Sequence, residues 1–317
     1  MRLLRHSETG DFSLTKDLVG DDLIPPYAIL SHTWGVDTEE VTFEDLTNGT
    51  GEGKPGYEKI RFCGVQARRD GLQHFWIDTC CINKSSSAEL AEAINSMYSW
   101  YHGAVKCYVY LPDVSVNSRT KHGQADEDEV GHETADYADF MEPDQKNEAQ
   151  GEVVENKSSH LAWIPSFKNC RWFTRGWTLQ ELIAPKWVEF FSIEGQRLGD
   201  KRSLEQQIHE VTGIDVEALR GSSLSQFSID RRMAWAAQRN TKREEDAAYS
   251  LLGLFDIHIP LIYGEGRRNA LLRLENAVKE SIMNRPLTLP RTLFPVDGNA
   301  FGLREGITFL SLSYSLA

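Results

Sequence analysis

The sequence predicts an α/β protein with a parallel sheet and a C-terminal helical extension. Short apolar runs alternate with helical segments from residue 27 to residue 191, a pattern typical of parallel strands joined by crossover helices. After residue 200 the chain turns to helical periodicities. We therefore expect a core over residues 1–200 and a helical extension over residues 201–284 that packs on it.

Four apolar runs supply the expected strands. The first covers residues 27–32 and follows two prolines, and the second covers residues 75–78 and ends on a carboxylate. The third and fourth cover residues 106–111 and 187–191. We interpret all four as buried strands of one sheet.

Helix signals separate and follow these runs. Residues 57–70 are expected to form a helix that Gly71 closes. Serines at 85–87 precede apolar side chains that step by four, three and four residues, which predicts a helix to about residue 101. A short helix carries Glu181 and is stopped by Pro185. The expected helices of the extension are residues 203–212, 228–239, 243–255 and 266–282.

Charge and composition restrict the class of protein. The chain has 317 residues and a formal charge of −13, and residues 117–160 hold twelve acidic against four basic side chains. We interpret residues 113–160 as an acidic insertion and leave residues 285–317 as a tail of unknown structure. An acidic chain argues against nucleic-acid binding. The five cysteines, the lack of a signal peptide and the lack of a membrane span predict a soluble cytoplasmic protein.

Common catalytic motifs are absent from the sequence. Residues 48–55 lack the spacing of a phosphate loop, and there is no GxSxG elbow and no GxGxxG after a strand. The histidine spacing of a zinc helix is also missing. We therefore expect no metal site and no required cofactor.

Several longer blocks resemble the fungal heterokaryon incompatibility (HET) domain and occur in the order of that family. They are Tyr27-Ala-Ile-Leu-Ser-His-Thr-Trp-Gly35, Trp76-Ile-Asp-Thr-Cys-Cys-Ile-Asn83, Arg175-Gly-Trp-Thr-Leu-Gln-Glu-Leu182, Glu245-Asp-Ala-Ala-Tyr-Ser-Leu-Leu-Gly253 and Ile262-Tyr-Gly-Glu-Gly266. The resemblance implies a role in fungal non-self recognition, in which such domains trigger programmed cell death after incompatible fusion.

HET domains are in turn similar to TIR domains, so the resemblance implies a TIR-like, flavodoxin-type sheet. The spacing from Trp177 to Glu181 is similar to the TIR Trp-x-x-x-Glu pattern, whose glutamate is catalytic in members that cleave NAD. By this resemblance Glu181 is the candidate catalytic carboxylate, Trp177 belongs to the ligand site, and NAD is the candidate substrate. The long insertion before the motif departs from the TIR pattern.

Polar residues at strand ends define the expected site, because ligands of such sheets bind at the carboxyl ends of the strands, near the switch in strand order. The residues that leave the first two strands are Ser31, His32, Trp34, Gly35 and Asp78. Glu181 beside them would stabilise the oxocarbenium-like state of nicotinamide–ribose cleavage. The alternative is a structural glutamate that pairs with Arg175 or caps a neighbouring loop.

Each neighbouring candidate also has two interpretations. Asp78 would bind a ribose or hold His32, or it would only form a turn. His32 would donate to a phosphate or move a proton, or it would be a structural group. Trp34 would stack on a base, or it would fill the core. Arg175 would neutralise a pyrophosphate, or it would pair with the acidic insertion.

Three functions remain open from the sequence. The first is a HET-type effector of cell death that cleaves NAD or a related nucleotide. The second is a non-enzymatic signalling module that acts through self-association and protein partners, with the helices at residues 86–101 and 229–239 as assembly faces. The third is a nucleotide sensor without turnover. An apolar patch on those helices, without a pocket at Glu181, would favour the second.

Overall fold

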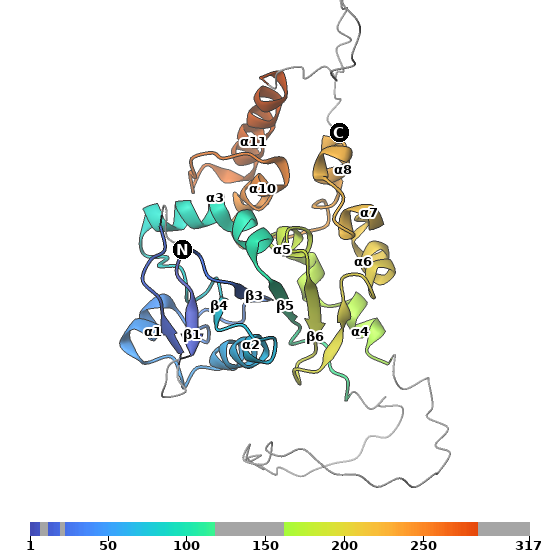
Figure 1. Ribbon diagram of the computed structural model, residues 1–317. Helices are drawn as coiled ribbons and strands as arrows, with labels where there is room; N and C mark the ends of the chain where they lie inside the picture. Colours follow the sequence, from blue (N-terminus) through green and yellow to red (C-terminus); the bar gives the residue numbers. More distant parts are fainter. Residues whose placement is uncertain (7–11, 20–22, 118–161, 285–317) are drawn as a thin grey trace, which may run out of the picture.

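The computed structural model describes residues 1–6, 12–19, 23–117 and 162–284, and it contains one seven-stranded sheet with helices around it (Figure 1). The strands are β1 (Leu4–His6), β2 (Phe12–Leu14), β3 (Tyr27–His32), β4 (His74–Trp76), β5 (Lys106–Tyr110), β6 (Val188–Phe191) and β7 (Arg197–Asp200). Their order in the sheet is β2-β1-β4-β3-β5-β6-β7. The α/β class predicted from the sequence is confirmed.

The four predicted strands form the parallel centre of the sheet. Strand β3 pairs with β4 on one side and with β5 on the other, and β5 pairs with β6, all in parallel. Every residue of β3 is buried, as expected for a strand covered on both faces. Across the sheet these strands follow one another as β4, β3, β5 and β6, which are the second, first, third and fourth of them in the chain. The strand order therefore reverses between β3 and β5. Ligand sites of doubly wound sheets lie at such a reversal.

The expectation of an entirely parallel sheet is wrong at both edges. Strand β1 is antiparallel to both β2 and β4, and β7 is antiparallel to β6. β7 returns directly after β6 through a tight turn at Gly195, and strands joined by so short a connection must run antiparallel. The missed strands have three or four residues each, which is too short for a periodicity to be recognised.

Helices cover both faces of the sheet. They are α1 (Phe43–Asn48), α2 (Tyr57–Arg69), α3 (Ser87–Gly103), α4 (Ile164–Lys168), the 3-10 turn η2 (Arg171–Thr174) and α5 (Thr178–Ile183). The consecutive residues Phe75 and Trp76 of β4 point to opposite faces. Phe75 meets Gly64 of α2, while the Trp76 ring lies 5.9 Å from the ring of Tyr101 in α3. Helices α2 and α3 therefore pack on opposite sides.

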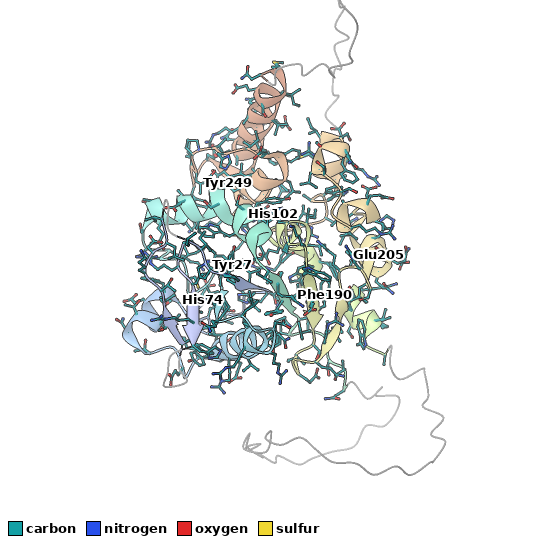
Figure 2. The ribbon with its side chains drawn as sticks, viewed as in Figure 1. Tyr27, His74, His102, Phe190, Glu205 and Tyr249 are labelled. Carbon is teal, nitrogen blue, oxygen red and sulfur yellow. The ribbon has the colours of Figure 1, made fainter. Side chains whose placement is uncertain are left out.

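Aromatic side chains fill the core beyond β5. Phe190 of β6, labelled in Figure 2, meets Phe167 of α4 at 5.2 Å and Trp172 of η2 at 5.6 Å between ring centroids. Both contacts are edge-to-face, the arrangement that aromatic quadrupoles favour. They fix η2, and with it the segment that enters α5, against the sheet.

The chain after residue 200 is helical, as predicted. Its elements are α6 (Glu205–Thr212), α7 (Val216–Leu219), η3 (Leu224–Gln226), α8 (Ile229–Ala234), α9 (Asp246–Tyr249), α10 (Leu252–Phe255) and α11 (Gly266–Met283). Helix α3 lies between the sheet and α10 (Figure 1). The expected helices at residues 228–239 and 243–255 are shorter in the structure, and the second is divided into α9 and α10.

The acidic insertion begins later than expected. Val114 is fully buried, and its carbonyl accepts a hydrogen bond of 2.9 Å from the amide of Ile193, so it belongs to the core. Residues 118–160 of the expected insertion and the tail at residues 285–317 lie outside the described residues.

The proposed assembly faces do not carry an apolar patch in the described part of the chain. Helix α3 exposes mainly polar residues, and residues 229–239 include the buried Trp235 and Arg239. Three large exposed apolar side chains lie on α11, at Leu272, Ile282 and Met283. Among the described helices none has both the length and the apolar character that a membrane span requires.

The contact between α10 and α3 depends on Gly253. A Cβ at this position would lie 2.0 Å from Cβ of Tyr98. We expect Gly253→Ala to lower the free energy of unfolding by about 1–3 kcal/mol, because the two helix backbones would have to separate. The control is Gly53→Ala, where a Cβ meets nothing within 4 Å. Denaturant titrations that give equal stabilities for the two variants would contradict this packing.

Candidate active site

The carboxyl ends of β3 and β4 meet α5 at one place. Ser31 and His32 are the last two residues of β3, and Asp78 follows β4 by two residues. Helix α5 approaches them through Glu181, since all six residues of this helix are buried. The structure thus brings together Ser31, His32, Asp78 and Glu181, as the sequence predicted.

Glu181 lies inside the protein, with 6% of its surface exposed. Its carboxyl accepts a hydrogen bond from the hydroxyl of Ser31. The Ser31 hydroxyl in turn accepts a bond of 2.7 Å from the indole nitrogen of Trp172. Because Trp172 can only donate, it orients the serine proton toward Glu181. In this conformation Ser31 covers the carboxyl.

Burial raises the pKa of Glu181 to about 8, and the negative charge of Asp78 adds to this shift. The hydrogen bond from Ser31 and the charges of Arg175 and Arg239 act in the opposite direction. Since desolvation disfavours the ionised form, the closed site holds mostly a neutral carboxyl at pH 7.

Asp78 joins His32 and Trp34. His32 Nε2 lies 3.1 Å from one carboxylate oxygen, and the indole nitrogen of Trp34 donates to the other at 2.8 Å. Burial alone would raise the pKa of Asp78, but the hydrogen bond from His32 and the positive charge of Lys84 hold it well below its usual range. Asp78 therefore holds His32, which is one of the two functional roles predicted for it. It does more than form a turn. The other ring nitrogen of His32, Nδ1, is buried without a partner among the described residues.

Arg175 and Gly35 lie at the border of this site. The guanidinium carbon of Arg175 is 6.0 Å from the centroid of the Trp34 ring. Among the described residues Arg175 forms no salt bridge with Glu181. Gly35 is exposed, but its amide donates to Glu40 at 2.6 Å. The Gly35 amide is thus already occupied and is not directed at a ligand in this conformation.

The indole of Trp177 is bound by the helical extension. Its indole nitrogen donates to Asp246 of α9 at 3.2 Å, and the hydroxyl of Tyr263 donates to the same carboxylate at 2.9 Å. The expectation that Trp177 belongs to the ligand site is not supported by these contacts. Its indole instead attaches α5 to the helical extension.

Two buried cations that the sequence did not single out hold α5. Arg239 is 6% exposed and donates to the carbonyl of Arg175 at 2.9 Å and to the hydroxyl of Thr178 at 2.8 Å. Lys201 is 4% exposed and donates to the carbonyls of Leu182 and Pro185. Burial lowers the pKa of Lys201 to about 8. Nothing in the neighbouring sequence indicates that either side chain reaches α5.

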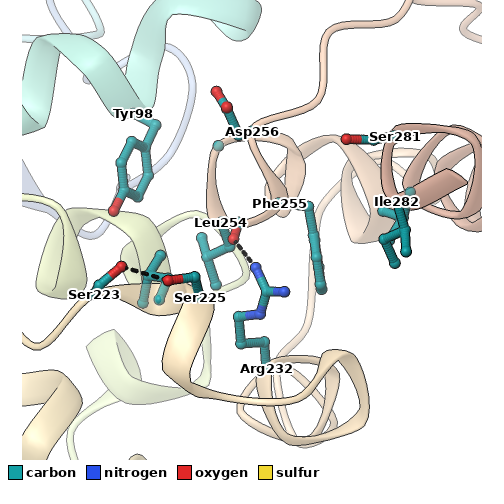
Figure 3. Close-up of a pocket in the computed structure, with 12 residues that line it drawn as sticks. Tyr98, Ser223, Ser225, Arg232, Leu254, Phe255, Asp256, Ser281 and Ile282 are labelled. Carbon is teal, nitrogen blue, oxygen red and sulfur yellow. Dashed lines mark hydrogen bonds between the residues drawn. The ribbon is translucent and has the colours of Figure 1, made fainter. Parts of the chain in front are cut away.

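Other parts of the described structure offer no second centre of this kind. No group of three or more His, Cys, Asp and Glu side chains among the described residues is arranged to hold a metal ion. The five cysteines are all buried and free. A cavity of about 250 Å³ lies where α3, α8, α10 and α11 meet, with Tyr98 and Arg232 in its wall (Figure 3). It includes none of the predicted site residues.

Comparison with known proteins identifies the family. Residues 27–181 match the family model described as heterokaryon incompatibility protein (HET). The vegetative incompatibility protein HET-E-1 of Podospora anserina is 54% identical over 278 residues, or 88% of this chain. The chain carries a HET domain. It spans only 18% of the length of the Podospora protein. No solved structure matches the chain.

The HET domain match contains the whole candidate site. The range 27–181 begins with β3 and ends at Glu181, so every site residue predicted from the sequence lies inside it. Lys201 and Arg239 lie outside it. The side chains that hold α5 in place are therefore supplied by a part of the chain that the family model does not cover.

The raised pKa of Glu181 predicts how stability depends on pH. Between its ordinary value of 4.5 and about 8, the folded protein keeps a proton that the unfolded chain has lost. The wild type therefore loses stability as pH rises through this range, whereas Glu181→Gln does not titrate. We expect the stability of the variant relative to the wild type to rise by up to about 1.4 kcal/mol per pH unit.

Denaturant titrations at several pH values measure this difference. The control is Glu210→Gln on α6, because Glu210 is exposed and its pKa is lowered by the hydrogen bond from Lys168. The difference in the free energy of unfolding between Glu210→Gln and the wild type should not change from about pH 5 to about pH 8. If the stability of Glu181→Gln relative to the wild type is also independent of pH, the Glu181 carboxyl is not protonated in the folded protein.

Proposed function

We propose that this HET domain acts in heterokaryon incompatibility, and that it triggers cell death by hydrolysing the nicotinamide–ribose bond of NAD with Glu181 as the catalytic carboxylate. Incompatibility is supported by the family and by the printed name of the Podospora relative. The cleavage is supported by one observation above all: a buried carboxyl lies at the carboxyl end of β3, where the strand order reverses.

The order of the parallel strands agrees with the TIR-like fold that the resemblance implies. β4, β3, β5 and β6 follow the order with which flavodoxin-type sheets begin. Glu181 occupies the place of the glutamate in the Trp-x-x-x-Glu pattern. The hydrogen bond of Trp177 to Asp246 is compatible with this assignment, because the proposed chemistry requires only the carboxylate.

The reaction would break the bond between C1′ of the ribose and the nicotinamide nitrogen. The electron pair leaves with nicotinamide, water adds its oxygen to C1′, and the water proton goes to solvent. Positive charge develops on the ribose, and an ionised Glu181 beside it would stabilise that charge in a site without bulk water. The cationic nicotinamide ring of the bound substrate would itself favour the ionised carboxylate.

Turnover requires that the site open. The Glu181 carboxyl is covered by Ser31 and is 6% exposed, so the ribose must displace the serine hydroxyl from it. Helix α5 would remain in place during this step, because all six of its residues are buried and both of its ends are hydrogen-bonded. Self-association of HET domains, the other function considered, would be one means of favouring the open state.

Nicotinamide release from NAD tests the proposal. We expect Glu181→Ala to lower the rate by at least about a hundredfold, since it removes the charge that stabilises the transition state. Glu210→Ala, which removes an exposed carboxylate on α6, should leave the rate unchanged. Release that survives in Glu181→Ala rejects the assignment. Toxicity in cells that is untouched by Glu181→Ala but lost on mutation of α11 would favour a non-enzymatic assembly.

The pH profile of the reaction should report the same carboxyl. Because the ionised form is required and the pKa is about 8, kcat/KM should rise with pH and level off above about pH 8. Ser31→Ala should move the midpoint upward, since the serine hydrogen bond lowers the pKa of Glu181. Steady-state rates of both proteins from about pH 6 to about pH 9 would reveal the shift, and coincident profiles would count against this role of Ser31.

A further inference from the structure

Two cationic side chains lie near one indole ring at the border of the Glu181 site. The ammonium nitrogen of Lys84 lies 3.8 Å from the centroid of the Trp34 ring, and the guanidinium carbon of Arg175 lies 6.0 Å from the same centroid. The two charges therefore cannot be farther apart than the sum of these distances. Among the described residues neither cation has a carboxylate within salt-bridge distance.

The indole that both cations approach is held in place. Its nitrogen donates to Asp78, and Asp78 is bound on its other oxygen by His32. Trp34 is thus fixed to the end of β4 and to the last residue of β3. A cation gains only a modest attraction over an indole at an exposed site. The ring positions the two cations without neutralising them.

Three nearby carboxylates are already engaged, and the exposed Glu39 lies beside Gly35. Both oxygens of Asp78 are occupied, Glu40 pairs with Lys59 and accepts from the Gly35 amide, and Asp37 pairs with Lys242. Glu181 is held mostly neutral by burial. Among the described residues, Lys84 and Arg175 are thus the cations beside Trp34 that form no salt bridge with a carboxylate.

We infer that Lys84 and Arg175, placed by Trp34, form a phosphate subsite that takes the diphosphate of a nucleotide. Arginine presents a planar fork that matches phosphate oxygens, and lysine adds a compact charge that need not be oriented. The subsite lies beside Asp78 and His32, on the side of the site open to solvent. Trp34 then supports the cations and does not stack on a base.

This inference rests on the proposed function, which places the nicotinamide ribose of the same ligand at Glu181. A diphosphate held at Trp34 would leave the nicotinamide ribose to reach Glu181. The subsite would then select nucleotides that carry a diphosphate and reject nucleosides. Nicotinamide riboside, which has the reactive bond but no phosphate, would lack this part of the binding energy.

Calorimetric binding to Glu181→Gln protein tests the subsite without the need for turnover. The probes are NAD, nicotinamide riboside and inorganic pyrophosphate. We expect Lys84→Ala and Arg175→Ala each to weaken binding of NAD and pyrophosphate by about tenfold or more, the loss typical of a charge-assisted hydrogen bond. Binding of nicotinamide riboside should not change. Added salt should weaken pyrophosphate binding in the parent protein and less in either variant.

Controls separate the loss of charge from the loss of fold. Lys279→Ala removes an exposed cation on α11 and should leave all three affinities unchanged. Arg175→Lys retains the charge and should recover part of the pyrophosphate affinity. If an alanine variant unfolds at a lower temperature than the parent, Arg175→Lys and Lys84→Gln are compared instead.

The two proposals fail in different ways. Pyrophosphate binding that depends on Lys84 and Arg175, together with absent nicotinamide release, would support the subsite and reject cleavage. Nicotinamide release with a KM for NAD that is unchanged in both variants would support cleavage and overturn the subsite. A parent protein that binds neither NAD nor pyrophosphate would also overturn it.

Discussion

The site depends on two buried cations that hold a very short helix. Helix α5 has six residues, and an isolated helix of this length is not stable in water. Arg239 binds the carbonyl and hydroxyl groups at its N-terminal end, and Lys201 satisfies the carbonyls at its C-terminal end. Lys201 thereby satisfies a terminal carbonyl that has no partner within the helix, whereas Arg239 joins the start of the helix to the helical extension. The position of Glu181 follows from them.

The segment that enters α5 is held with similar precision. The amide of Gly176 donates to the carbonyl of Asn240 at 2.8 Å, and the amide of Asn240 donates to the carbonyl of Thr174 at 2.6 Å. A Cβ on Gly176 would lie 2.4 Å from a methyl group of Thr241, so only glycine permits this approach. The glycine between Arg175 and Trp177 thus allows the helical extension to contact the backbone beside the catalytic candidate.

Two carboxyls in one site have pKa values displaced in opposite directions. Glu181 is buried next to a hydroxyl and the charge of Asp78, which favours its neutral form. Asp78 is bound by His32 and Trp34 and lies near Lys84, which favours its charge. Such divergence is typical of sites where carboxyl groups have separate tasks. Here Asp78 organises His32 and Trp34, while Glu181 keeps a buried carboxyl bound by Ser31.

The sequence by itself determined the central strands, the main helices and the family. Continuous apolar runs and local caps suffice for this, as at Ser86, whose side chain accepts from the amide of Glu89, because they involve residues close together in the chain. Only the tertiary structure decided the antiparallel edge strands, the hydrogen bond of Trp177 to Asp246, and the contacts of Lys84, Lys201 and Arg239. Ser31 and Glu181 are separated by 150 residues, and Arg239 and Thr178 by 61. Buried polar contacts over such separations leave no periodicity in the sequence, since they depend on where the packed elements place each side chain.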